Sequence, residues 1–365
     1  MDVSGRAPEA ESYRFETVVG GLRRPWGVAW LPSGDMLITE RPGQLRLVRD
    51  GELVEAPIAG VPEVAAFGQG GLMDVSVHPR FADNGFVYLT YTDGAPRANR
   101  TVMSRGRLEG ERLVGVEEIF RVAQTKSGGQ HFGSRILWLP DGTMLLSIGD
   151  GGNPPVRYEG GYIREQAQNT GTHLGKVLRL NDDGSTASGN PFVGDSGAAP
   201  EVYSYGHRNI QGMARDPESG RIYASEHGAR GGDELNIVEP GVNYGWPVAT
   251  YSREYFGPRI SQQTTADGMR DPIVVWTPAT APSGLAFYTG DRHPEWRGDL
   301  FSGSLVARHV RWVDLDDNGM PIGQREFLTD GKRVRDVREG PDGHIYVLTD
   351  EEPGELLRLL PGEGG

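Results

Sequence analysis

Apolar and polar positions along this chain follow one pattern that occurs six times. In each copy a short apolar run leads into a turn rich in Pro, Gly or Asp, and a second apolar run follows. This pattern predicts a hairpin of two β-strands. Repeated hairpins indicate a closed, radially repeated all-β fold, in which residues at equal positions of different repeats meet around one axis. The six copies begin at Trp26, Leu72, Arg135, Ile210, Ser283 and Val334.

The spacing of the repeats predicts a β-propeller with four-stranded antiparallel blades. Apolar residues run almost unbroken in VYLTYT from Val87 and MLLSIGD from Met144, as expected for strands buried on both faces between stacked blades. A β-sandwich is the alternative, but a sandwich does not repeat one hairpin six times. We find no linker, so residues 1–365 are expected to form one domain, with residues 1–12 as a loose N-terminal segment. The longer spacings leave room for inserted loops at 151–168, 181–199 and 247–270.

Composition narrows the classes of partner. The net charge of the 365 residues is −13, which argues against nucleic acid because phosphate binding needs a basic surface. No apolar stretch approaches the roughly 20 residues of a membrane helix, so no membrane span is expected. The absence of cysteine excludes disulfides and thiolate catalysis. The first residues lack a basic region followed by an apolar run, so no signal peptide is predicted.

Unusual polar residues stand just before the first strand of four repeats. Gln69 precedes its turn proline by ten residues, and His131, Arg208 and Arg333 precede theirs by nine, nine and eight. The repeat places them at one end of the channel, and strand alternation turns Arg335 to the same side as Arg333. Three converging guanidinium groups in an acidic protein favour an anionic ligand, either a polycarboxylate or a phosphate.

The alternative is that each arginine pairs with a nearby acid. Arg335 would then pair with Asp336 or Asp330, and Arg208 with Glu201. Because the arginines converge as a set, we favour a shared ligand over separate local pairs.

His131 lies in the glycine-rich segment SGGQHFGSR, whose glycines allow the backbone to approach a ligand closely. A lone histidine is more often structural than catalytic. Beside the arginines, His131 becomes the best general-base candidate, since the pKa of histidine lies near neutrality. His207 and His227 flank neighbouring motifs and are candidates for supporting residues.

The segment 226–236, EHGARGGDELN, combines three carboxylates with three glycines. Carboxylate and carbonyl oxygens suit a hard cation such as calcium. A solvated acidic turn fits the same composition, and the spacing is not that of an EF-hand loop, so both interpretations stay open.

Taken together, several motifs resemble the soluble aldose sugar dehydrogenases that use pyrroloquinoline quinone (PQQ), relatives of soluble quinoprotein glucose dehydrogenase. The resemblance covers nearly the whole chain in the right order, and the ordered set is far more specific than any motif alone. The motifs are FGQGGL at 67–72, HFGSR at 131–135, YGHRNIQGMA at 205–214, EHGARGGDELN, NYGWP at 243–247 and KRVRDVREGPDGHIYVLTDE at 332–351.

The resemblance implies a six-bladed propeller with the quinone at one end of the channel. His131 matches the histidine that takes the proton from the sugar C1 hydroxyl while hydride passes to the quinone. The quinone carries three carboxylates, which agrees with the converging arginines. Positions that match quinone contacts are Gln69, Arg208, Asn209, Tyr255, Arg333 and Arg335.

Calcium is also implied by the resemblance. One ion would polarise the quinone through backbone carbonyls at the positions of Gly228 and Ala229, which is the role of a Lewis acid. Another would use positions matching Glu234 and the backbone of Tyr244.

The chain departs from the family pattern at two places. Val306 stands where many relatives have a lysine that contacts the quinone, and Arg308 or Lys332 is expected to substitute for it. Gln130 precedes the histidine where the glucose dehydrogenase branch has an acid, which places the chain with the broader aldose-oxidising branch.

The function predicted from these residues is oxidation of aldose sugars to lactones with PQQ and calcium, followed by electron transfer to a small-molecule or protein acceptor. A calcium-dependent propeller lactonase and a non-catalytic binding propeller are the alternatives. The resemblance implies a periplasmic or secreted protein, present as a monomer or homodimer.

Overall fold

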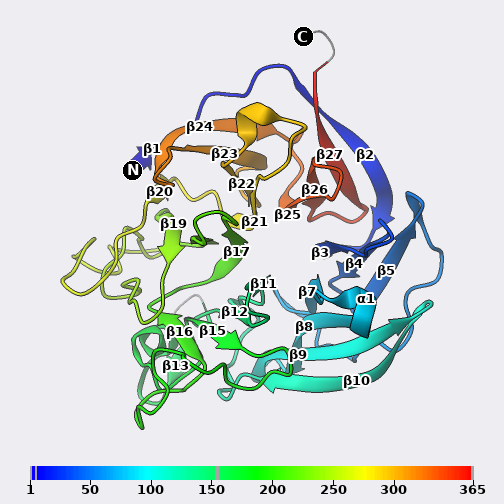
Figure 1. The fold of residues 1–365 in the computed structure, drawn as a ribbon. Coiled ribbons are helices and arrows are strands. Elements are labelled where there is room, and N and C mark those ends of the chain that lie inside the picture. Colours follow the sequence, from blue (N-terminus) through cyan, green and yellow to red (C-terminus); the bar gives the residue numbers. More distant parts are fainter. Residues whose placement is uncertain (1, 5, 153–155, 363–365) are drawn as a thin grey trace.

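The computed structural model describes residues 2–4, 6–152 and 156–362. Six small sheets surround a central channel as the blades of a six-bladed β-propeller (Figure 1), which confirms the predicted fold class. Each blade has four antiparallel strands, and in blade 4 a short strand, β1, adds to the outer strand in parallel.

The strands follow one another from the channel outward in five of the blades. Blade 1 holds β3 (Pro25–Trp30), β4 (Met36–Glu40), β5 (Gln44–Arg49) and β6 (Glu52–Leu53), and blade 2 holds β7 (Leu72–Val77), β8 (Phe86–Ala95), β9 (Ala98–Glu109) and β10 (Arg112–Arg121). Blade 3 holds β11 (Ile136–Trp138), β12 (Met144–Ile148), β15 (Lys176–Leu180) and β16 (Val202–Tyr205). Blade 4 holds β17 (Ile210–Arg215), β18 (Ile222–Glu226), β19 (Asp233–Val238), β20 (Val274–Thr277) and β1 (Asp2–Ser4). Blade 5 holds β21 (Pro282–Phe287), β22 (Leu300–Ser304), β23 (His309–Leu315) and β24 (Pro321–Leu328).

Blade 6 is built from both ends of the chain. It holds β25 (Val334–Glu339), β26 (Ile345–Thr349), β27 (Gly354–Pro361) and, outermost, β2 (Tyr13–Leu22). β2 pairs antiparallel with β27, so the ring is closed by hydrogen bonds between a strand near the N-terminus and the last strand of the chain. Closure packs the first and the last blade against each other, and the separate blades keep only short sheet edges.

The remaining elements are short. They are α1 (Phe81–Asn84), β13 (Arg157–Tyr158), β14 (Gly161–Tyr162) and the 3₁₀ helices η1 (Ile163–Gln168) and η2 (Pro294–Trp296). Within the described ranges no helix is long and apolar enough to cross a membrane.

The first hairpin turn of three blades has the same geometry. Leu31, Leu139 and Gly340 each donate a backbone hydrogen bond of 2.8 Å to the carbonyl four residues later. The turn glycines Gly34 and Gly142 have φ of 92° and 83°, a conformation that side chains disfavour. The repeated Pro/Gly/Asp motif therefore fixes the hairpins locally.

Alternate residues of one strand enter the cores on its two sides. All five residues of β12 are buried. Met144 and Leu146 belong to the apolar cluster shared with blade 2, whereas Leu145 belongs to the cluster shared with blade 4. This two-sided burial is the physical reason for the unbroken apolar runs in the sequence.

The six innermost strands contact one another in the order β3, β7, β11, β17, β21, β25 and back to β3. Each is the first of the blade-forming strands in its repeat, and all run the same way along the channel. The residues that precede them therefore gather at one channel end.

The N-terminal segment expected to be loose has contacts where it is described. The backbone N–H of Ala10 donates to the Glu326 carbonyl at 2.9 Å, and that of Ala7 donates to the Glu326 side chain at 2.9 Å. Residues 7–10 thus lie against β24 instead of extending freely into solvent.

A buried ionic cluster joins three innermost strands inside the channel. Arg135 contacts Asp74 at 3.0 Å and Asp336 at 3.1 Å, and Arg338 contacts the same two acids at 3.1 and 3.0 Å. Burial raises the pKa of Asp74, and the positive charges of Arg135 and Arg338 oppose this rise. The cluster ties blades 2, 3 and 6 together across the channel.

Replacing Arg135 by methionine is expected to destabilise the fold by about 3–5 kcal/mol, because two buried carboxylates would keep only one counter-charge. Arg49→Met is the matched control, since its ion pair with Glu111 is about half exposed and such pairs contribute about 0–1 kcal/mol. Urea unfolding of both variants measures the difference, and equal losses would contradict this account of the cluster.

Candidate active site

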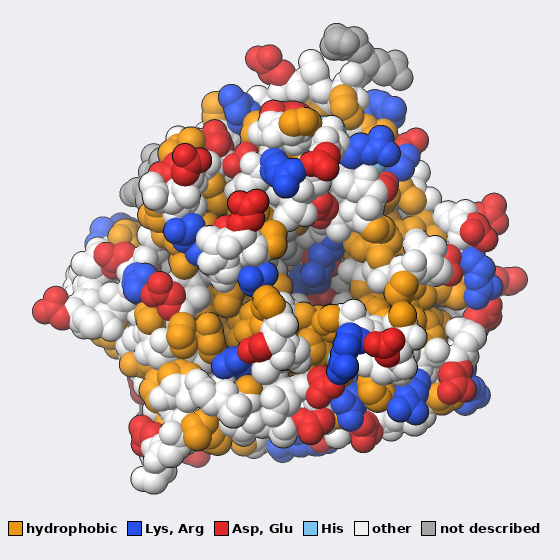
Figure 2. Space-filling view, viewed as in Figure 1, with side chains coloured by type: hydrophobic (Ala, Val, Ile, Leu, Met, Phe, Trp, Pro, Cys, Tyr) orange, Lys and Arg blue, Asp and Glu red, His pale blue; other side chains and the backbone are white. Residues whose placement is uncertain are grey.

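A cavity of about 480 Å³ lies at the channel end where these residues gather. Figure 2 shows the hollow at the centre of this face, with Lys or Arg side chains inside it. Trp26, Met73 and Phe132 supply apolar lining. The basic residues that line the cavity are Arg24, Arg41, Arg333 and Arg335.

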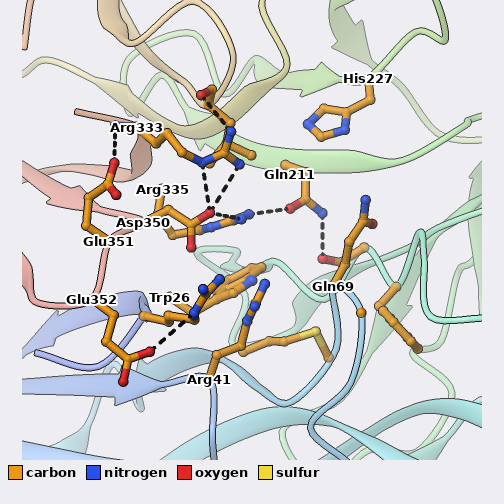
Figure 3. A pocket seen from close by; sticks show the side chains of 16 residues that line it. Trp26, Arg41, Gln69, Gln211, His227, Arg333, Arg335, Asp350, Glu351 and Glu352 are labelled. Carbon is orange, nitrogen blue, oxygen red and sulfur yellow. Dashed lines mark hydrogen bonds and ion pairs between the residues drawn. The ribbon is translucent and has the colours of Figure 1, made fainter. Parts of the chain in front are cut away.

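Arg333 and Arg335 converge on one carboxylate, as Figure 3 shows. Their guanidinium groups reach the same oxygen of Asp350, at 3.3 Å and 3.2 Å. Burial opposes ionisation of Asp350, but Arg335, Arg41 and Arg333 together hold its pKa below the ordinary value. The Nε of Arg335 and the other oxygen of Asp350 are buried without a hydrogen-bond partner among the described residues. The site therefore offers a ligand one free hydrogen-bond donor and one free acceptor.

His131 is held in a fixed orientation beside the cavity. Its backbone has φ of 53°, and its N–H donates to the Gln69 side chain at 2.9 Å. Its Nδ1 lies 2.6 Å from Asp150, which also accepts the indole N–H of Trp246 at 2.8 Å. The imidazole is 4% exposed, and its neighbour Phe132 lines the cavity.

The charge state of His131 follows from its surroundings. Burial and the nearby Arg208 lower its pKa, although Asp150 acts in the opposite direction. The imidazole is therefore neutral near pH 7. With Nδ1–H donating to Asp150, the proton-accepting nitrogen is Nε2.

Arg208 enters the same end of the channel from blade 4. Its guanidinium donates to the carbonyls of His227, at 3.2 Å, and Gly228, and it lies 5.2 Å from the Trp246 ring. Its backbone N–H donates to Glu226 at 2.7 Å. No carboxylate of the described chain forms an ion pair with this guanidinium.

The alternative prediction, that Arg208 and Arg335 pair with acids near them in sequence, named the wrong acids. Glu201 contacts His173 at 3.4 Å, not Arg208. Asp336 contacts Arg135 at 3.1 Å and also Arg338, whereas Arg335 pairs with Asp350. Asp350 is remote in sequence and faces the shared cavity.

Three of the expected quinone contacts, Arg208, Asn209 and Tyr255, lie outside the cavity lining, as does the expected base His131. Asn209 is buried, and its side-chain oxygen accepts the Gly133 N–H at 3.1 Å, so it joins blades 3 and 4. Tyr255 is 43% exposed on the 247–270 loop and is not part of the cavity wall.

Two acids of the 226–236 segment, Glu226 and Asp233, accept hydrogen bonds from backbone N–H groups. Glu226 accepts hydrogen bonds from His207 and the Arg208 N–H at 2.9 and 2.7 Å. Asp233 accepts the N–H groups of Gly228 and Ala281, both at 2.7 Å. Among the described residues no group of three or more His, Asp or Glu side chains could hold a metal ion.

The metal positions implied by the resemblance are engaged in other contacts. Gly228 and Ala229 lie on the loop beside Arg208, and the Gly228 carbonyl accepts from that guanidinium. Among the described residues, the Glu234 side chain accepts one long contact, of 3.3 Å, from Asn236. Tyr244 stacks on His207 with ring centroids 4.6 Å apart.

The expected substitutes for the family lysine do not reach the cavity. Val306 is 60% exposed, Arg308 donates to the Gly331 carbonyl at 3.0 Å, and Lys332 pairs with Glu355 at 2.5 Å. Neither cation lines the cavity.

Several residues of this site were missed from the sequence, among them Trp26, Arg41, Asp150 and Asp350. Asp150 and Asp350 closely follow β12 and β26, the second strands of their hairpins. An acid at the end of the second strand of a repeat was the signal that could have identified them.

The fold and the site define a class of protein: a β-propeller with an arginine-lined cavity beside a histidine–carboxylate pair. Residues 22–358 match the family described as Glucose / Sorbosone dehydrogenase, and the chain belongs to that family. It is thus an oxidoreductase, which confirms the family and enzyme class predicted from the motifs.

Known relatives resemble the chain over almost its full length. Aldose sugar dehydrogenase YliI of Escherichia coli K12 is 39% identical over 352 residues, covering 95% of this chain and 92% of that protein. The crystal structure of the soluble aldose sugar dehydrogenase of E. coli in the apo-form has a TM-score of 0.90 and 38% identity, over 96% of this chain and 100% of that chain. The PQQ-bound form of aldose sugar dehydrogenase from Streptomyces coelicolor has a TM-score of 0.76 and 29% identity, over 97% and 99% of the two chains.

Proposed function

We propose that this oxidoreductase oxidises the C1 hydroxyl of aldose sugars to the lactone, using PQQ and passing the electrons to an external acceptor. The observation that carries the proposal is the His131–Asp150 pair, 2.6 Å apart, beside a cavity lined by four arginines. The PQQ-bound relative supports the identity of the cofactor.

The residues present fit a flat tricarboxylate. The volume of about 480 Å³ lies within the range of small-molecule sites, roughly 300–1,000 Å³. The buried Nε of Arg335 is a donor that has no acceptor among the described residues. Trp26, Met73 and Phe132 offer apolar surface to a ring system. Arg333, Arg335 and Gln69 line the cavity and would hold the cofactor, and Arg208 and Asn209 are further proposed contacts.

When bound, the quinone would supply the hydride acceptor. The chain supplies the base, because Nε2 of neutral His131 accepts the hydroxyl proton of the sugar. Asp150 fixes the tautomer by accepting Nδ1–H, and its negative charge stabilises the imidazolium that forms. Gln69 holds the His131 backbone in its left-handed conformation.

Calcium belongs to the same proposal. Glu234 fits a hard cation because burial and the nearby Glu226 raise its pKa well above the ordinary value, as expected for a carboxylate that lacks a counter-cation. The backbone of Tyr244 would complete that site. Calcium at the Gly228 and Ala229 carbonyls would share the Gly228 oxygen with the Arg208 guanidinium, which donates to it.

The test is reconstitution of purified apoprotein with PQQ, with and without calcium, followed by dye reduction with glucose and a panel of other aldoses. We expect dye reduction and lactone formation. No dye reduction with any aldose, together with no binding of PQQ, would overturn the proposal. Lactone hydrolysis without PQQ would favour the lactonase alternative.

A periplasmic or secreted location is also proposed, and fractionation of the native cells tests it.

The pH dependence of kcat/KM follows from the direction of the His131 shift. Its pKa is lowered from 6.5, so the neutral base persists below that pH and activity is lost only as pH falls through the lowered value. We expect an acid limb with an apparent pKa below 6.5. A limb above the ordinary histidine value would contradict the assignment of His131 as the base.

A further inference from the structure

Arg41 lines the cavity, and its guanidinium has no hydrogen-bond or ion-pair partner among the described residues. Burial lowers the pKa of Arg41, and the neighbouring arginines act in the same direction. Asp350 acts in the opposite direction. The neighbouring arginines are Arg335, Arg24 and Arg333. Arg333 and Arg335 share the carboxylate of Asp350, and Arg24 lies 3.4 Å from Glu352. Arg41 is thus the least neutralised cation of the cavity wall.

The chain holds Arg41 firmly at this place. It follows β4 directly, in the turn of the second hairpin of blade 1, and its carbonyl accepts the N–H of Leu72 at 3.0 Å. A Cβ at Gly71 would lie 2.0 Å from that carbonyl, so only glycine permits this approach of blade 2 to the turn. Two neighbouring blades therefore position the base of the side chain.

The side chain of Arg41 enters the cavity from the wall across from Arg333. Figure 3 shows its guanidinium directed toward Trp26 and the space in front of it. A ligand on Trp26 would meet Arg41 on one side and the Arg333–Arg335 pair on the other. This arrangement suits an anion that carries carboxylates on more than one edge.

We propose that Arg41 binds a carboxylate of PQQ. It would thereby supply the positive charge that this chain lacks at Val306, where many relatives have a lysine. The inference rests on the proposed function, which provides a tricarboxylated ligand. It replaces the expectation that Arg308 or Lys332 fills this role, because both are engaged outside the cavity.

The experiment is calorimetric titration of PQQ into apoprotein in the presence of calcium. Arg41→Met is expected to weaken PQQ binding about 10- to 100-fold, the value of a charge-assisted hydrogen bond. Arg41→Lys keeps the charge but loses the two-pronged geometry, so an intermediate affinity is expected. Thermal unfolding midpoints of both variants establish that they are folded.

Arg23→Met is the matched control. Arg23 is next to the cavity residue Arg24, and its ion pair with Glu352, at 3.3 Å, is about half exposed. It is not part of the cavity wall. Removing this charge is expected to change PQQ affinity less than about threefold, since exposed charges are screened.

The trimethyl ester of PQQ separates a carboxylate contact from a general effect on the cavity. The wild type is expected to bind the ester more weakly than the free acid, and Arg41→Met should bind the ester as well as the wild type does. If Arg41→Met binds the free acid like the wild type, this inference fails while the proposed function stands. If the wild type binds neither form, both fail.

Discussion

Replacing His131 by alanine is expected to lower the rate of aldose oxidation about 10²- to 10⁴-fold, the usual contribution of a positioned general base. The affinity for PQQ should stay within about threefold of the wild-type value, because the proposed cofactor contacts are other side chains. A loss of binding without a loss of catalysis would instead raise KM and leave kcat unchanged. Steady-state kinetics with a dye acceptor and calorimetric titration of PQQ give the two quantities.

His173→Ala is the matched control for this prediction. His173 is also buried and also contacts a carboxylate, Glu201 at 3.4 Å, but it does not line the cavity. Its replacement should leave the rate within about threefold of the wild type, since it is remote from the reacting groups. Added imidazole should partly restore the activity of His131→Ala and should not affect the control. Equal rates for wild type and His131→Ala would exclude this residue as the base.

The fold was predictable because its information is local and repeated. Each turn motif specifies a hairpin, and two-sided burial of the inner strands leaves unbroken apolar runs such as those at Val87 and Met144. Closure of the ring by β2 was not visible, because that strand pairs with β27 across almost the entire sequence. Long-range pairing of this kind leaves no periodic signal of its own.

The convergence of the polar residues was predictable from the repeat, but their partners were not. Arg335 does not pair with the adjacent Asp336, because neighbouring residues of a strand project to opposite sides. Asp336 instead enters the ionic cluster with Arg135, and Arg335 reaches Asp350 on the neighbouring strand end. Adjacency in sequence is therefore a poor guide to ion pairs on a strand.

The missed acids follow a rule that the repeat contains. The second strand of a hairpin runs back toward the channel end where the first strand begins, so a residue after it lies beside the residue before the first strand. Asp150 meets His131 in this way, and Asp350 meets Arg333. Glu226, the last residue of β18, likewise accepts from the N–H of Arg208.

Replacing Asp150 by asparagine is expected to slow aldose oxidation about 10²- to 10⁴-fold, the range of a positioned base and its carboxylate partner. Asp150 has two oxygens that accept from three donors, His131 Nδ1–H, the Gly152 N–H at 3.2 Å and the Trp246 indole at 2.8 Å. An amide has one acceptor atom and no charge, so at least one contact is lost in either orientation and the imidazolium loses its counter-ion. Steady-state kinetics with saturating PQQ measure the change in rate.

A second readout distinguishes loss of charge from loss of packing. Asp150 raises the pKa of His131 against the larger effects of burial and Arg208. Its neutralisation should lower that pKa further, so the acid limb of kcat/KM moves to lower pH while the rate on the plateau falls. Trp246→Phe removes a neutral donor from the same carboxylate and should leave the limb at or above its wild-type position, because Asp150 keeps its charge. If Asp150→Asn slows the reaction with the limb unmoved, or moves it to higher pH, then the carboxylate positions His131 without stabilising its charged form, and the electrostatic part of this assignment is wrong.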